Sequence, residues 1–144
     1  MTQRQFFLAA VTAALVWPLA SFADNESTAT ELRDLTIQNM KACQDEDLDA
    51  AMSTLHSQSP AYLPTKQQTS ILFENFDLKY ELAAFKYIGQ DGEYAVARIK
   101  QKTTKVAGPA FQNNVTDLIA VFRKENGHWK FWNQIILGTK YLNE

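Results

Sequence analysis

Apolar and polar residues alternate with a period of two through much of the chain from Asp77 onward. This period places successive side chains on opposite faces of a β-strand. The alternation is interrupted at Asp91-Gly92 and Asn126-Gly127, pairs typical of the type I′ turns that join antiparallel strands. Gly108-Pro109 separates the two stretches. The pattern therefore predicts two hairpins, which together form a four-stranded antiparallel meander.

A two-residue loop fixes which side chains share a face. With the first loop at Asp91-Gly92, Tyr80 faces Thr103, Leu82 faces Gln101 and Ala84 faces Ile99. With the second at Asn126-Gly127, the predicted inner face holds Thr116, Leu118, Ala120, Phe122, Trp129, Phe131, Asn133 and Ile135. The predicted outer face holds Asp117, Ile119, Val121, Arg123, Lys130, Trp132, Gln134 and Ile136. Both faces carry large apolar groups. In a sheet with one face exposed to solvent, apolar and polar residues alternate more regularly than this, so we expect the outer face to contact a partner.

Helical spacing replaces this alternation before residue 77. The capping box at residues 28–31 predicts a helix from there to about residues 44–46. Asp47 is predicted to cap a second, short helix, and a further capping box at residues 65–68 predicts a third. Three helices followed by four strands indicate an α+β fold, with N-terminal helices packed on a curved four-stranded antiparallel sheet.

The first 23 residues have the three parts of a signal peptide: Arg4, an apolar run from Phe6 to Ala20, and small residues before a cleavage point after Ala23. The run is shorter than the roughly 20 residues that a membrane-spanning helix needs. An uncleaved N-terminal anchor is the alternative. We expect a signal peptide over 1–23, a single domain over 24–144, and a periplasmic or secreted protein with no stable membrane anchor after cleavage.

Net charge and cysteine content narrow the class of protein to which the chain can belong. Loss of Arg4 leaves 13 of the 14 basic residues against 16 acidic ones, a net charge of −3, which gives no reason to expect nucleic-acid binding. Cys43 is the single cysteine, so the stability of the domain must come from its core and not from an internal disulfide. We expect Cys43 to be half-buried in a helix; an intermolecular disulfide is the alternative.

The order of elements, read with Asp47-Leu48-Asp49, Asp91-Gly92-Glu93-Tyr94-Ala95 and the run Phe122 to Phe131, resembles the nuclear transport factor 2-like superfamily, which includes ketosteroid isomerase-like and SnoaL-like proteins. The resemblance implies a cone with a cavity between the curved sheet and the helices, and dimers formed through the outer face of the sheet. Residues 56–76 form a brief segment, so we expect the extra strand that many relatives carry there to be missing.

Extending the strand parity inward predicts a largely apolar cavity, with Met52 and Leu55 on its wall and few polar groups, the usual form of a small-ligand site. The predicted ligand-binding residues are His56, Tyr62, Phe73, Tyr80, Gln101, Asn114, Thr116, Phe131 and Asn133. The predicted interface of a homodimer comprises Ile119, Val121, Trp132 and Ile136. The alternative is a packed core without a void.

Catalysis of the isomerase type needs a carboxylate inside the cavity, and the parity directs Asp117 outward. A base at His56, with Tyr62 or Tyr80 as its partner, is the alternative. We expect no metal and no cofactor, because residues 45–56 lack the glycine and glutamate of a calcium loop and the two histidines have no ligand spacing. The preferred hypothesis is an exported non-catalytic module that binds a small apolar or amphipathic ligand. The alternatives are a ketosteroid isomerase-like or lyase-type enzyme and a protein-binding or inhibitory module.

Overall fold

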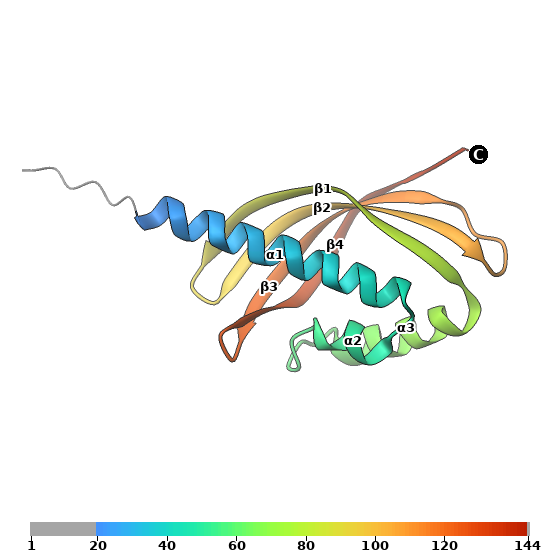
Figure 1. Cartoon of the computed structure of the whole chain (residues 1–144), viewed down its shortest axis with the longest axis horizontal. Helices are drawn as coiled ribbons and strands as arrows, with labels where there is room; N and C mark the ends of the chain where they lie inside the picture. The colour runs from blue at the N-terminus through green and yellow to red at the C-terminus, as the bar shows by residue number, and fades with distance from the viewer. Residues whose placement is uncertain (1–19, 144) are drawn as a thin grey trace, which may run out of the picture.

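The computed structural model describes residues 20–143, with side chains from residue 24. Its elements are α1 (Ala20–Gln44), α2 (Leu48–Ser53), α3 (Tyr62–Asn75), β1 (Asp77–Asp91), β2 (Tyr94–Ala107), β3 (Asn114–Glu125) and β4 (His128–Tyr141). The strands form one antiparallel sheet in the order β1-β2-β3-β4. The sheet arches over the three helices, which lie on one of its sides (Figure 1). The predicted α+β fold class is therefore confirmed.

The core lies between α1 and the inner face of the sheet. Leu32, on α1, is completely buried, and so are Ala95, Ala97 and Ala120 at the middle of the sheet. Their small side chains leave room for the helix to approach closely. Larger residues complete the same cluster: Leu35, Met40, Ile99, Leu118, Phe122, Trp129 and Phe131.

Two of the three predicted helix starts are wrong. α1 begins at Ala20, so Thr28 is an internal residue; its buried hydroxyl donates to Gln90 Oε1 at 3.0 Å and ties the helix to the end of β1. α3 begins at Tyr62 and contains Pro64 in its first turn, where a missing N–H costs nothing because the first four have no helical partner. The cap at Asp47 is confirmed, since its side chain accepts from Ala50 N at 2.9 Å.

The predicted signal peptide lies outside the described residues except for positions 20–23, which belong to α1. It therefore stays a prediction, as does the domain boundary that follows it. Within residues 20–143, no helix has both the length and the hydropathy needed to cross a membrane.

The first hairpin turns one residue later than predicted, because Asp91 pairs with Tyr94. The predicted partners of Tyr80 and Leu82 are nevertheless correct. β-bulges between Leu82 and Ala84 and between Tyr87 and Gly89 absorb the difference. The prediction for Ala84 is wrong: Phe85, and not Ala84, pairs with Ile99.

The second hairpin turns at Asn126-Gly127 as predicted, with φ of 51° and 81° at these residues. Phe122 pairs with Phe131, but Trp132 is the extra residue of a β-bulge and Val121 pairs with Asn133. Each later side chain of β4 therefore changes face up to the next bulge, at Leu137. The inward prediction for Ile135 and the outward predictions for Gln134 and Ile136 are wrong: Gln134 and Ile136 pair with the buried inner residues Ala120 and Leu118.

Between α2 and α3, the β pairing of the chain is limited to one parallel bridge, from Leu55 to Phe131. His56 N donates to Phe131 O, and Phe131 N donates to Thr54 O, both at 2.9 Å. The segment thus touches the edge of β4 where many relatives were expected to carry a further strand, and it forms no strand of its own.

Candidate functional site

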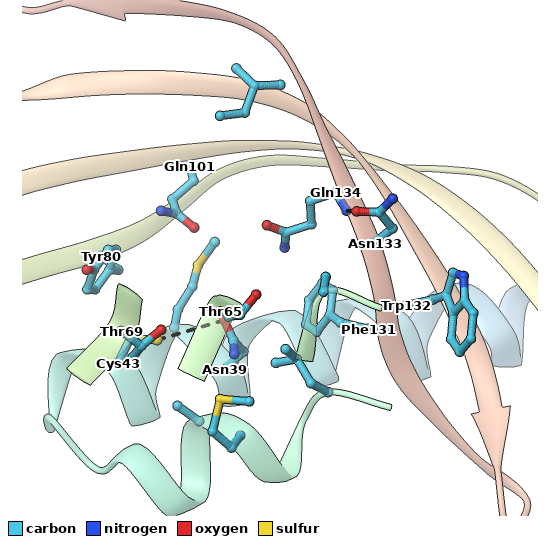
Figure 2. A pocket seen from close by; sticks show the side chains of 16 residues that line it. Asn39, Cys43, Thr65, Thr69, Tyr80, Gln101, Phe131, Trp132, Asn133 and Gln134 are labelled. Carbon is cyan, nitrogen blue, oxygen red and sulfur yellow. Dashed lines mark hydrogen bonds between the residues drawn. The ribbon is translucent and has the colours of Figure 1, made fainter. Parts of the chain in front are cut away.

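A cavity of about 360 Å³ lies between the helices and the inner face of the sheet (Figure 2). Its volume falls within the range typical of small-ligand pockets. The residues that line it come from every helix and from β1, β2 and β4: Asn39, Met40, Cys43, Ala51, Met52, Leu55, Ala61, Thr65, Thr69, Tyr80, Gln101, Phe131, Trp132, Asn133, Gln134 and Ile136.

The α3 wall explains why this space stays open. Ala61, Thr65 and Thr69 recur every four residues and so form one stripe facing the cavity. The larger Leu63 and Ile71 point away, with 68% and 62% of their surface exposed, and α3 buries no residue completely. Because the helix turns its small side chains toward the sheet, the space between them is not filled.

The α1 wall is held in place by a polar contact. Asn39 and Cys43 lie one helical turn apart, and Asn39 Nδ2 donates to the buried Thr54 Oγ1 at 2.8 Å. This bond joins α1 to the end of α2. Asn39 Oδ1 lies 4.0 Å from Cys43 Sγ, so the amide also orients the thiol.

The sheet supplies both an apolar floor and polar groups. Phe131 packs against Phe122 with ring centroids 4.7 Å apart. Gln101 Nε2 donates to Thr103 Oγ1 at 3.3 Å. The bulge at Trp132 brings Gln134 to the cavity, as Figure 2 shows.

The lining is electrically neutral: none of the sixteen residues is Asp, Glu, Lys, Arg or His. Burial raises the pKa of the Cys43 thiol to about 11. Burial, together with the nearby Cys43, also raises the pKa of Tyr80 above its ordinary value. Both groups are therefore protonated at neutral pH.

Several polar groups at the cavity lack a partner. Among residues 20–143, nothing bonds to the hydroxyls of Thr65, Thr69 and Tyr80 or to the side-chain amide of Gln134. Each of these groups can both donate and accept. The site can thus hold a molecule that has an apolar body and neutral hydrogen-bonding groups.

The structure brings together four of the nine predicted ligand-binding residues, Tyr80, Gln101, Phe131 and Asn133, and places the others elsewhere. Asn133 borders the cavity although its predicted pairing with Ala120 is wrong. Tyr62 and Phe73, on α3, are half-buried outside the lining. Asn114 and Thr116 bond to each other at 3.2 Å instead of facing the cavity.

His56 is buried away from the cavity. Its Nδ1 accepts from Gln58 N at 3.1 Å, and its ring meets Trp132 edge-on at 5.0 Å. Glu125 Oε1 lies 3.6 Å from Nδ1 and accepts hydrogen bonds from the hydroxyl and the backbone N–H of Ser57. Ser57 therefore bonds to the carboxylate, so this cluster fixes a loop and has no geometry for a nucleophile activated by histidine.

Sequence reasoning missed several lining residues. Helical spacing could have revealed Asn39, which lies one turn before Cys43 in the first predicted helix. The late start assigned to α3 hid the stripe that begins at Ala61. No glycine or proline marks the bulge at Trp132, so nothing local indicated that Gln134 and Ile136 would turn inward.

The outer face of the sheet carries an apolar patch, which we define as Val96, Ile119, Val121 and Ile135. Val96 pairs with Val121, and Ile119 pairs with Ile135. Ile119 and Val121 belong to the predicted dimer interface, whereas Ile136, also predicted there, borders the cavity instead. Asp117 faces outward as predicted, held by Arg98 through contacts of 2.8 and 2.6 Å.

One end of this patch carries a stacked arginine. The guanidinium of Arg123 lies 4.8 Å from the ring centre of Trp132 and 5.4 Å from that of Tyr94. Trp132, the third residue of the predicted interface, thus packs at the margin of the outer face and also contacts the cavity.

The fold is that of the nuclear transport factor 2-like superfamily, as the resemblance implied. A candidate aromatic ring hydroxylase from Novosphingobium aromaticivorans aligns with a TM-score of 0.67 and 15% identity, covering 81% of this chain and 94% of that one. A candidate dehydratase of the NTF2-like family from Streptomyces avermitilis gives 0.61 and 14%, covering 76% and 94%. A protein of unknown function from Mycobacterium tuberculosis gives 0.71 and 8%, covering 88% and 78%. At such identities the likeness shows the fold alone.

The chain belongs to the family of the C-terminal domain of the anti-sigma-I factor RsgI9, whose family model matches residues 34–142. No curated protein matches the sequence.

Proposed function

We propose that the protein is an exported, non-catalytic module that binds a small, neutral, amphipathic molecule in the cavity. The observation that carries this proposal is the neutral lining, in which unpaired hydroxyl and amide groups stand above an apolar floor. The pattern of residues 1–23 supports export to the periplasm or beyond.

The chemistry of the cavity favours a neutral ligand. Its volume of about 360 Å³ corresponds to on the order of ten water molecules, and an apolar body that displaces them from Met52, Leu55 and Phe131 gains hydrophobic free energy. A charged group would lose its hydration without meeting an opposite charge, at a cost of several kcal/mol.

Binding is supported over catalysis by the residues present. A proton shift of the isomerase type requires a base that reaches the ligand. Within the described part of the chain, the cavity lining offers no carboxylate or imidazole, and His56 is turned toward Trp132 and Glu125.

The test compares two ligands that differ in charge, 1-octanol and octanoate, by thermal unfolding and calorimetry. Octanol at 100 times its Kd is expected to stabilise the protein by about 2.7 kcal/mol. For a domain of this size, the corresponding rise in Tm is on the order of 10 °C. Octanoate is expected to bind at least tenfold more weakly.

A matched pair of variants locates the site. Thr69→Phe fills the cavity and is expected to abolish octanol binding, whereas Gln68→Phe adds the same ring at the adjacent exposed position and is expected to bind like the wild type. The proposal fails if octanol leaves the wild type unchanged, or if Thr69→Phe binds it as well as Gln68→Phe does.

We further propose that the outer apolar patch pairs two copies of the chain. Contiguous apolar side chains on an otherwise charged sheet face support this, because exposed apolar patches mark interaction sites. The substitution Val121→Lys places a charge at the centre of the patch and is expected to abolish this contact in sedimentation velocity. If the outer face instead binds a different protein, the wild-type chain alone will show no self-association through this face in sedimentation velocity. The substitution Val121→Lys will then leave the measured mass unchanged.

A further inference from the structure

A second, smaller hollow lies beside the cavity, between α1 and the first half of β1. Its volume is about 250 Å³. Small-ligand pockets typically have volumes of roughly 300–1,000 Å³, so this hollow is too small to be such a site by itself. We call it the side hollow, and six residues border it: Ile37, Met40, Lys41, Gln44, Tyr80 and Leu82.

Two residues, Met40 and Tyr80, border both the side hollow and the cavity. Their side chains therefore separate two spaces that lie next to each other. Figure 2 shows Tyr80 at one end of the cavity. Met40 is buried, and the unbranched side chain of methionine adapts readily to new neighbours because it has three rotatable bonds. In the described part of the chain nothing bonds to the Tyr80 hydroxyl, so moving this ring breaks no hydrogen bond.

The side hollow offers hydrocarbon to a ligand. Ile37 and Leu82 are aliphatic. Lys41 contributes its aliphatic stem, because its ammonium group is paired with Asp45. The amide oxygen of Gln44 already accepts from a backbone N–H of β1 at 3.4 Å. A chain of CH₂ groups therefore suits this space better than a polar head group does.

The cavity holds the unbonded hydroxyl and amide groups, so the two spaces differ in polarity. We propose that the protein binds an unbranched, neutral, long-chain amphiphile. Its head lies among the hydroxyl and amide groups of the cavity, and its tail passes between Met40 and Tyr80 into the side hollow. This inference rests on the proposed function of the cavity and adds the shape and length of the ligand. Because only two side chains have to part, a single hydrocarbon chain can pass, whereas a ring requires a wider opening.

The test compares 1-octanol with 1-dodecanol, which has the same head group and a longer chain, by calorimetry below their solubility limits. Each buried CH₂ group strengthens binding about fourfold, which corresponds to about 0.8 kcal/mol. Four additional CH₂ groups should therefore make dodecanol bind the wild type about 200-fold more tightly than octanol does. Cyclododecanol, whose carbons form a ring, is expected to lack this gain.

A matched pair of variants locates the tail. Ile37→Trp places a large ring at the side hollow and is expected to abolish the gain, so that dodecanol binds about as tightly as octanol. Ile71→Trp makes the same exchange on the exposed side of α3 and is expected to keep the gain. Octanol is expected to bind both variants as it binds the wild type. Ile37 and Ile71 expose 40% and 62% of their surface, so both exchanges are made outside the core.

Nuclear Overhauser effects give a second readout, which needs no substitution. In the wild type, the terminal methyl group of dodecanol is expected to contact the methyl groups of Ile37 and Leu82, and that of octanol is not. The inference is overturned if this contact is absent, if dodecanol or its loss of affinity in Ile37→Trp shows no advantage over octanol and Ile71→Trp, or if cyclododecanol gains as much as dodecanol. In each of these cases octanol still binds and the proposed function stands, whereas absence of octanol binding overturns both.

Discussion

Gly108 lies in the connection between β2 and β3 and packs closely against the end of α3. Its replacement by alanine tests how much this close packing contributes to the stability of the fold. Gly108 has φ of +115°. A Cβ at this position would lie 2.6 Å from the carbonyl oxygen of Asn75 and 3.1 Å from both Cα and Cδ1 of Phe76. Phe76 in turn meets Phe111 with ring centroids 5.9 Å apart. The substitution therefore pushes on backbone and not on a flexible side chain.

Two costs add in Gly108→Ala. A residue with a Cβ held at positive φ costs roughly 1–2 kcal/mol. Relieving a contact of 2.6 Å requires the end of α3 to move, at a cost typical of overpacking, about 1–3 kcal/mol. We therefore expect a loss of about 3 kcal/mol. Gly92→Ala is the matched control, since Gly92 has φ of +57° but nothing within 4 Å, and it is expected to lose about 1 kcal/mol.

Urea unfolding followed by tryptophan fluorescence measures the difference. With a slope of about 2 kcal/mol per molar urea, Gly108→Ala lowers the midpoint by about 1.5 M and Gly92→Ala by about 0.5 M. Equal losses in the two variants would refute the reasoning, because the contact with Asn75 and Phe76 would then contribute nothing beyond the strain at positive φ.

Two further predictions concern ionisation. Because burial raises the pKa of Cys43 to about 11, its reaction rate with a thiol reagent should rise about tenfold per pH unit up to that value; a plateau near pH 9 would contradict this. The Ser57 hydroxyl, which bonds to the Glu125 carboxylate, holds the pKa of that group below its ordinary value of 4.5. Glu125 therefore contributes stability above pH 4.5 that is lost as pH falls through the lower folded value. In urea unfolding, the wild type should be more stable than Glu125→Gln above pH 4.5, and this difference in stability should disappear as the pH falls below 4.5. The control Glu26→Gln, at an exposed position, should have the stability of the wild type throughout. A difference between the wild type and Glu125→Gln that stays constant with pH would contradict the prediction.

Local sequence was sufficient where a short segment satisfies its own backbone. Asn126-Gly127 adopts positive φ twice at low cost, so the reversal could be placed to the residue. Asp47 accepts from Ala50 three residues ahead, a contact that forms within a single turn. The pair Asp91-Gly92 did not place its turn to the residue, because Gly92 alone adopts positive φ there. Two bulges in β1 then restore the predicted pairing of β1 with β2 farther from the turn.

The capping box at residues 28–31 predicted the wrong helix start because its threonine bonds to a residue far away in the sequence. Thr28 has a side chain typical of an N-cap, but its hydroxyl donates to the side chain of the distant Gln90, and the helix extends back to Ala20. Nothing in the four residues of the box reveals a bond that spans 62 positions of the chain.

The bulge at Trp132 had the largest consequence for the site. It allows Phe131 to stay in the core beside Phe122, while the ring of Trp132 stacks on Arg123. His56 N–H donates to the carbonyl oxygen of Phe131, the residue before the bulge, and the Ser59 hydroxyl donates to the carbonyl oxygen of Trp132 itself. These contacts come from three separate parts of the chain, so the exchange of faces after residue 132 was not available from alternation alone.

The sequence by itself determined the order of the elements, the turn at Asn126-Gly127, the outward direction of Asp117 and the α+β fold class, because each depends on local spacing and backbone preference. Tertiary structure alone decided that a cavity exists and what borders it. An open space depends on how far α3 stands from the sheet and which of its sides faces inward, and both follow from long-range contacts at Gly108, Asn39 and Phe131.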